Sequence, residues 1–176
     1  VGVVATQSFV NPSYGPKGLA LMEQGLSPQQ ALEALLANDN GEMFRQVAFL
    51  NTKGDVATHT GSSCIEAAGH RQGKNFSVQA NMMLNNTVWD AMANAFEKTT
   101  GDLSDRMIAA LKAAQGEKGD IRGSQSAAIL IVKDKATGNS WEDIVMDLRV
   151  EDHVNPVQEL ERLVKMQKAY DFMNKG

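Results

Sequence analysis

The sequence predicts a single α+β domain with at least one antiparallel sheet. Stretches rich in β-branched and alternating apolar residues occur near the start, middle and end of the chain, and amphipathic helical stretches separate them. The predicted order is strand, two helices, a β-hairpin, a strand, two helices, two strands and a final helix, unlike the regular alternation of βαβ folds. Residues 1–176 contain no internal stretch with the composition of a linker, so we expect one domain.

The N-terminal half is predicted to pair short helices with antiparallel strands. A run rich in Gly and Pro ends the first strand, and Ser27 and Pro28 supply an N-cap and a first-turn proline for the second helix. A four-residue connection that contains Gly joins the next two strands, which is typical of a β-hairpin. The predicted elements are a strand over 1–10, helices over 19–24 and 29–37, and hairpin strands over 45–51 and 56–61.

The C-terminal half is predicted to hold the deepest strand of the core. Residues 126–132 are apolar at both alternating sets of positions, as expected for a strand covered on both faces. Residues 144–150 alternate between apolar and mostly polar residues, so one face of that strand is free to line a site. The other predicted elements are a strand over 75–84, a helix over 88–99 capped by Asn85-Asn86, a helix capped by Ser104 and ended by Gly116 and Gly119, and a long helix from Asn155-Pro156 to about Met173.

Composition excludes several classes of partner. The chain has 17 Lys plus Arg and 21 Asp plus Glu, a formal charge of −4, so it lacks the basic excess that nucleic-acid binding requires. Its longest apolar run, 127–132, is far shorter than the roughly 20 residues of a membrane span, so we expect no membrane partner. A single cysteine, Cys64, excludes an internal disulfide and fits a reducing compartment, so we expect a cytoplasmic location.

We expect neither a metal nor a cofactor. The three histidines, His59, His70 and His153, show no HExxH or paired Cys/His spacing. The chain also has no GxGxxG or GxxxxGK phosphate-binding motif.

Two segments near the N-terminus have both a structural and a functional interpretation. The run 11–18 forms a rigid loop whose Tyr14 hydroxyl and Asn11 amide could face a ligand. Gly and Pro also occur in ordinary loops, and we favour this purely structural interpretation. Cys64 with a nearby histidine could form a nucleophile pair, but a free cysteine is more often a small buried hydrophobic residue. His70, in a predicted loop, could orient or protonate a ligand or serve a purely structural role.

Two pairs of opposite charge lie next to the C-terminal strands. Asp120 and Arg122 precede the apolar strand 126–132, where they could shape a pocket or form an ordinary loop salt bridge. We favour the pocket. Asp147 and Arg149 point to the same face of the last strand, so Arg149 could hold a substrate carboxylate or simply neutralise Asp147.

Several short motifs together resemble one known family. From about Val1 to Leu163, the chain is similar to an uncharacterised Ntn-hydrolase-like family, the domain of unknown function numbered one thousand and twenty-eight. The motifs that carry this resemblance are Ala5-Thr6-Gln7, the segment 11–18, Thr60-Gly61 with Cys64, Ala68-Gly69-His70, Gln79-Ala80-Asn81, Gly119-Asp120 with Arg122-Gly123, Gln125-Ser126-Ala127-Ala128, and Asp147-Leu148-Arg149-Val150 with Asp152-His153.

The resemblance implies a four-layer αββα sandwich of two mainly antiparallel sheets, and hydrolysis of an amide bond. In Ntn hydrolases the nucleophile is an N-terminal Thr, Ser or Cys whose own α-amino group is the base. Val1 has no nucleophilic atom and Thr6 is internal, so the catalytic residue is unknown and we expect it upstream of this chain, together with missing N-terminal strands. That upstream piece could be a processed fragment, a segment that this sequence does not include, or a separate chain.

The leading hypothesis is a hydrolase that acts on a small amide or peptide-like substrate. On this view Asn81 or Gln125 is a candidate oxyanion donor and Arg149 a carboxylate anchor. The alternatives are a non-catalytic ligand-binding or scaffolding domain and, third, a Cys64 thiol hydrolase. The expected partners are the substrate, an upstream fragment of the same protein and a second copy, since exposed sheet edges favour a homo-oligomer. The predicted substrate-binding residues are His70, Asn81, Asp120, Arg122, Gln125, Asp147 and Arg149.

Overall fold

The computed structural model describes residues 1–174 and has the predicted α+β composition. Short 3-10 turns over Glu42–Phe44 and Ser140–Glu142 precede two of the strands. The helices and strands in chain order are β1 (Gly2–Ser8), α1 (Tyr14–Glu23), α2 (Pro28–Leu36), β2 (Arg45–Asn51), β3 (Val56–Thr60), β4 (Gly69–Gly73), β5 (Phe76–Ala80), α3 (Val88–Lys98), α4 (Leu103–Gly116), β6 (Ala127–Val132), β7 (Ile144–Val150) and α5 (Pro156–Met173).

All strand pairs in the described chain are antiparallel, which confirms the predicted hairpin. The first sheet has the order β1-β2-β3, and Ala48 in its central strand lies opposite Ala5 on one side and Thr58 on the other. The second sheet is the β4–β5 hairpin, in which His70 lies opposite Gln79. The third is the β6–β7 hairpin.

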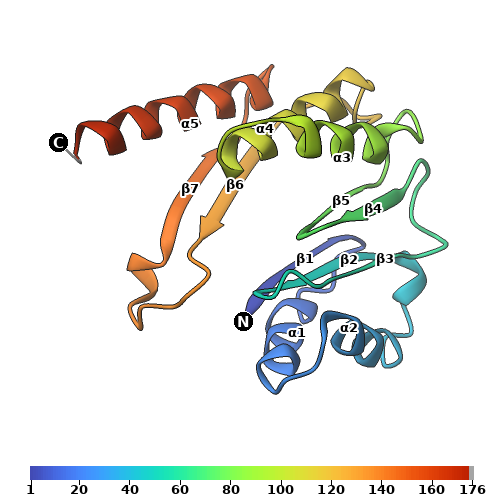
Figure 1. Cartoon of the computed structure of the whole chain (residues 1–176). Coiled ribbons are helices and arrows are strands. Elements are labelled where there is room, and N and C mark those ends of the chain that lie inside the picture. Colours follow the sequence, from blue (N-terminus) through green and yellow to red (C-terminus); the bar gives the residue numbers. More distant parts are fainter. Residues whose placement is uncertain (175–176) are drawn as a thin grey trace.

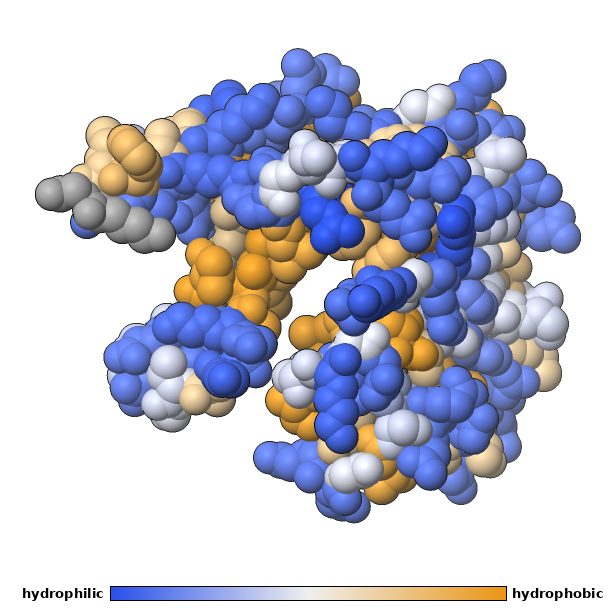
Figure 2. All heavy atoms as spheres, viewed as in Figure 1, coloured by the Kyte–Doolittle hydropathy of each residue, from blue (hydrophilic) through white to orange (hydrophobic). Residues whose placement is uncertain are grey.

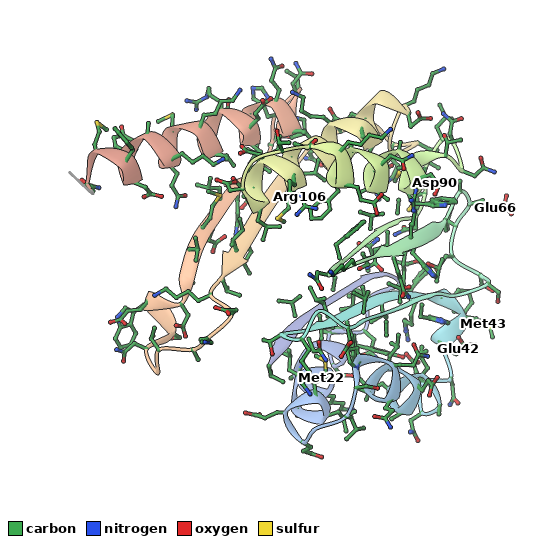
Figure 3. All side chains as sticks on the ribbon, viewed as in Figure 1. Met22, Glu42, Met43, Glu66, Asp90 and Arg106 are labelled. Carbon is green, nitrogen blue, oxygen red and sulfur yellow. The ribbon has the colours of Figure 1, made fainter. Side chains whose placement is uncertain are left out.

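The first two sheets stack between two pairs of helices. Helices α1 and α2 cover one face of β1–β3, the β4–β5 hairpin lies against the other face, and α3 and α4 cover β4–β5 (Figure 1). Separate apolar clusters fill the two spaces between helices and sheet. One contains Tyr14, Leu32, Val47 and Phe49, together with Met22 of α1, which is labelled in Figure 3. The other contains Phe76, Val78, Ala93, Phe96 and Ala110.

Arg106 joins the two helices that cover β4–β5. Its Nε donates to the backbone oxygen of Phe96 at 3.0 Å, and its guanidinium lies 4.0 Å from the centre of the Phe96 ring (Figure 3). This contact fixes the end of α3 against α4, because the cation is held both by a carbonyl and by the face of an aromatic ring.

The β6–β7 hairpin packs through one face only. Its inward residues, such as Ile129 and Met146, form a third core with Leu160 and Val164 of α5. The pattern of 126–132 predicts cover on both faces, and within residues 1–174 that prediction is wrong, since Leu130 is 57% exposed and Val132 43%. Figure 2 shows hydrophobic atoms on the hairpin beside an open gap between the hairpin and the rest of the molecule.

Several predicted boundaries need correction, among them the helix predicted over 19–24, because α1 already begins at Tyr14. Strand β4 contains His70, which was expected in a loop. The prediction was wrong because the residues GHRQG lack the apolar alternation typical of a strand, and the strand forms through pairing with β5. The strand predicted over 75–84 ends at Ala80, shortly before Met82 adopts a positive φ of 60°. The cap of α4 is Asp102, whose carboxylate accepts from the Asp105 N–H, and Ser104 lies inside the helix.

Helix α2 begins as its sequence predicts. The Ser27 hydroxyl accepts from the Gln30 N–H, and the Gln30 side chain accepts from the Ser27 N–H, which forms a complete capping box. Across residues 1–174, the structure contains no helix with both the length and the apolar character needed to cross a bilayer.

Candidate functional site

The layer between the first two sheets is polar. Gln46 of β2 is completely buried, and its Nε2 lies 2.9 Å from the Ala80 backbone oxygen and 3.0 Å from that of Gly69, both in the second sheet. Its Oε1 accepts hydrogen bonds from the side-chain amides of Gln7 and Asn81. Two facing sheets normally pack through apolar side chains, so a buried, hydrogen-bonded amide at this position distinguishes this layer from an ordinary apolar core.

The polar layer continues to the edge of the sheets. The Thr60 hydroxyl accepts from Gln46 Nε2 at 2.9 Å and lies 2.8 Å from His70 Nδ1. Burial lowers the pKa of His70, and the neighbouring His59 lowers it further, so the His70 imidazole is neutral at pH 7. Neutral Nδ1 can therefore accept the Thr60 hydroxyl hydrogen.

A wide cleft of about 1020 Å³ opens from the other end of this layer. It lies between the end of β1, the end of β5, helix α4 and the segment that leads into β6. Gln79 lines this cleft, and its side-chain Nε2 and Oε1 atoms are buried without a hydrogen-bond partner. Its polar lining residues include Gln7, Ser8, Gln79, Asn81, Gln115, Asp120, Arg122, Ser124, Gln125 and Ser126.

Four of the predicted site residues line this cleft: Asn81, Asp120, Arg122 and Gln125. Asp120 and Arg122 form a bidentate ion pair, with Arg122 Nε 2.9 Å from Asp120 Oδ1. The Arg122 guanidinium is the main cause that lowers the pKa of Asp120. The two charges compensate each other, so the cleft carries polar groups and little net charge at this wall.

The other three predicted residues lie outside the cleft lining. Asp147 and Arg149 are exposed on the open face of β7 and pair with each other, with Arg149 Nε 3.1 Å from Asp147 Oδ1. His70 lines a smaller hollow of about 430 Å³, together with Thr60, Gly61, Ser62, Cys64, Glu66, Ala68, Gly69 and Trp89.

Tyr14, the aromatic residue of the segment 11–18, has a structural role. Tyr14 begins α1 and is 2% exposed, and its hydroxyl donates to Asp39 Oδ2 at 3.1 Å. Burial and this hydrogen bond raise the pKa of Tyr14 to about 12. Arg45 Nε also donates to Asp39 at 2.8 Å, and together with Asn11 these residues tie the start of α1 to β2.

Cys64 is buried, as the structural interpretation expects. Only 8% of the residue is exposed, and its Sγ donates to the Arg45 backbone oxygen at 3.4 Å. In the part of the chain that the structure describes, no three His, Cys, Asp or Glu side chains gather closely enough to hold a metal ion.

Sequence reasoning missed the residues at the centre of the polar layer, Gln7, Gln46 and Gln79. A signal was present, since Gln46 interrupts a strand whose next residues are Val47, Ala48 and Phe49. A long polar side chain in such a strand requires a buried partner.

These features define an α+β protein in which two antiparallel sheets meet through hydrogen-bonding side chains and open into a polar cleft. The model of the family of unknown function DUF1028 matches residues 1–160, and the chain belongs to this family. The crystal structure of protein SPO2555 from Silicibacter pomeroyi, also described as DUF1028, is similar with a TM-score of 0.78 and 27% identity. The match covers 93% of this chain and 70% of that one. No curated protein matches the chain.

Proposed function

We propose that this domain is the larger part of an Ntn-type hydrolase and that its cleft binds a small amide or peptide-like substrate. The observation that carries the proposal is the polar layer around Gln46, which opens into the cleft at Asn81. The stacking of α1 and α2, β1–β3, β4–β5, and α3 and α4 supports an αββα sandwich of the Ntn kind (Figure 1).

The lining of the cleft suits an uncharged amide. Asn81 Nδ2 uses one hydrogen for Gln46, so its second is available to a substrate carbonyl. Gln125 offers a second amide donor in the lining of the same cleft. Because Asp120 and Arg122 neutralise each other, neither attracts a charged substrate strongly.

The nucleophile in this proposal belongs to a further segment of the family's chain, upstream of Val1. Free strand edges support such a segment: within the described residues, for example, β5 pairs with β4 alone, and β6 with β7 alone. The exposed Leu130 and Val132 of β6 supply an apolar face beside it. SPO2555 is also longer than the part of it that this chain matches. The proposal requires the N-terminal Thr, Ser or Cys of that segment to lie near Asn81, where its α-amine would take the nucleophile's proton.

Turnover of simple amides by the chain with its upstream segment tests this proposal. We expect Asn81→Ala to lower kcat/KM about 100-fold, because one oxyanion donor is lost. Asn94→Ala, on the exposed side of α3, is the matched control and should behave as the parent protein. N-terminal sequencing should find Thr, Ser or Cys at the mature terminus; any other residue there refutes the Ntn mechanism.

A non-catalytic ligand-binding domain is the second candidate. One observation favours it: among the described residues, the cleft-lining Ser8, Ser124 and Ser126 have no hydrogen bond to a histidine or carboxylate that could activate them. This candidate predicts saturable binding of amides, measured by calorimetry, without turnover in any form of the protein.

A further inference from the structure

A second concave site lies beside the Thr60 hydroxyl of the polar layer, whereas the cleft lies beside Asn81. The hollow of about 430 Å³ is formed where β3 ends and β4 begins, and Trp89 of α3 supplies an aromatic wall. Figure 3 shows Glu66 on the loop that joins β3 to β4, at the outer side of the molecule. Two of the family-like motifs, Thr60-Gly61 and Gly69-His70, meet here, and the cleft does not use them.

The hydroxyl and the imidazole in this hollow are arranged as a nucleophile and its base. Thr60 Oγ1 and His70 Nδ1 are 2.8 Å apart, within the range expected for such a pair. Gln46 Nε2 donates to the same hydroxyl oxygen at 2.9 Å. This fixes the direction of the Thr60 hydrogen, because an oxygen that accepts from Gln46 is free to donate its own hydrogen to Nδ1.

The surroundings favour loss of the Thr60 proton. The buried Gln46 amide shares its two hydrogens among the Thr60 hydroxyl and the Gly69 and Ala80 carbonyls, and this shared donor stabilises negative charge that develops on Oγ1. His70 is half-buried and neutral at pH 7, so Nδ1 is ready to accept a proton. Thr58, two residues earlier, differs: its hydroxyl accepts from the Gln72 amide at 2.6 Å and has no hydrogen bond to a histidine.

We propose that Thr60 is a nucleophile, with His70 as its base, in a second site that takes small uncharged acyl esters. Thr60 Oγ1 bonds to the acyl carbon as its proton moves to His70 Nδ1. The bond from that carbon to the leaving oxygen then breaks, and the leaving oxygen takes the proton. Water attacks the resulting Thr60 ester in the reverse sense, which releases the acid and restores the hydroxyl.

The hollow limits which esters can enter. Its volume suits an ester with a small acyl group and a leaving group of one ring, and the ring can pack on Trp89. Glu66 is the acidic residue of the lining and His70 is neutral, so anionic esters are disfavoured. The proposal does not depend on the activity proposed for the cleft.

Treatment with 4-nitrophenyl acetate tests the proposal. Release of 4-nitrophenolate gives the rate, and peptide mass mapping locates the acetyl group. We expect acetylation of Thr60, an about 100-fold slower release in Thr60→Val, and retained activity in Thr60→Ser. Thr58→Val, on the same face of the same strand, is the matched control and should release product at the parent rate. The rate should rise with pH as His70 loses its proton, below the usual histidine pKa, and then level off.

Several outcomes would overturn the proposal. These are acetyl groups found only on Cys64 or on lysines, an unchanged rate in Thr60→Val, or a folded but inactive Thr60→Ser. Urea unfolding checks that each variant is folded. If Thr60→Val does not fold, the mass map of the parent protein decides: an acetyl group on Thr60 supports the proposal and its absence refutes it. Cleft activity is measured separately with amides, so failure at one site is distinguished from failure at the other.

Discussion

Replacing Gln46 by Glu should make the stability of this protein strongly dependent on pH. Gln46 is completely buried, and its Nε2 faces the backbone oxygens of Gly69 and Ala80. In Gln46→Glu, an ionised carboxylate would offer only acceptors to these two carbonyls. The protonated acid would restore one donor, so burial and the missing donors must raise the pKa of the introduced carboxyl group in the folded protein.

The size of the effect follows from the hydrogen bonds. The protonated carboxyl group lacks one of the two donated bonds, which costs about 1 kcal/mol, and ionisation against the raised pKa adds about 2 kcal/mol. We expect a destabilisation of about 3 kcal/mol at pH 7 and of about 1 kcal/mol at pH 4. Because the pKa is raised in the folded protein, the favourable protonated form is fully present below the unfolded pKa of about 4.3. The unfolding free energy then falls as the pH rises through the folded pKa.

Urea unfolding at pH 4 and pH 7 measures this difference. The difference between variant and parent is the relevant quantity, because the natural carboxylates titrate in both proteins. Gln72→Glu adds the same charge to exposed Gln72 of β4 and should change the unfolding free energy by less than about 1 kcal/mol. A Gln46→Glu effect that is equal at both pH values would refute the reasoning, because it would mean that Gln46 does not depend on its two donor hydrogens.

Three further predictions concern the stability and reactivity of the scaffold. Asp39→Asn should lower the unfolding free energy by about 2 kcal/mol at pH 7. Hydrogen bonding to Arg45 lowers the pKa of Asp39, so this difference should shrink as the pH falls below about 4 in urea titrations. Asp102→Ala should cost about 1 kcal/mol, measured by thermal unfolding, because α4 loses its N-cap. The Ser104 hydroxyl and other donors lower the pKa of Asp102 to about 2, so this loss should disappear between about pH 4 and pH 2. Cys64 should react with iodoacetamide at least about 100-fold faster in urea than in buffer, measured by intact mass, since the folded chain buries it.

The matched control for the two carboxylates is Asp134→Ala, in the exposed turn after β6, which should leave stability unchanged at every pH. An equal loss in Asp134→Ala would show that net charge, rather than the contacts of Asp39 and Asp102, determines the effect. Fast alkylation of native Cys64 would contradict its burial and support the alternative that the protein is a Cys64 thiol hydrolase.

Local chemistry made much of the fold predictable. The hairpin of β2 and β3, the capping box at Ser27 and the long final helix all depend on neighbouring residues, so their signals survive in the sequence alone. The charged pair Asp120 and Arg122 was also predictable, because the two residues lie close along the chain and can meet without the rest of the fold.

Long-range packing decided the remainder. Strand β4 has little strand propensity and exists because β5 pairs with it, and Gln46 meets Asn81, 35 residues away, only when the two sheets stack. The apolar pattern of β6 correctly indicates a strand, yet how many of its faces are covered, and by which segments, is a property of tertiary contacts. The sequence by itself therefore determined most of the elements and their apolar positions. Only the tertiary structure decided which polar side chains share a site, because buried hydrogen bonds depend on distances that strand order and layer stacking set.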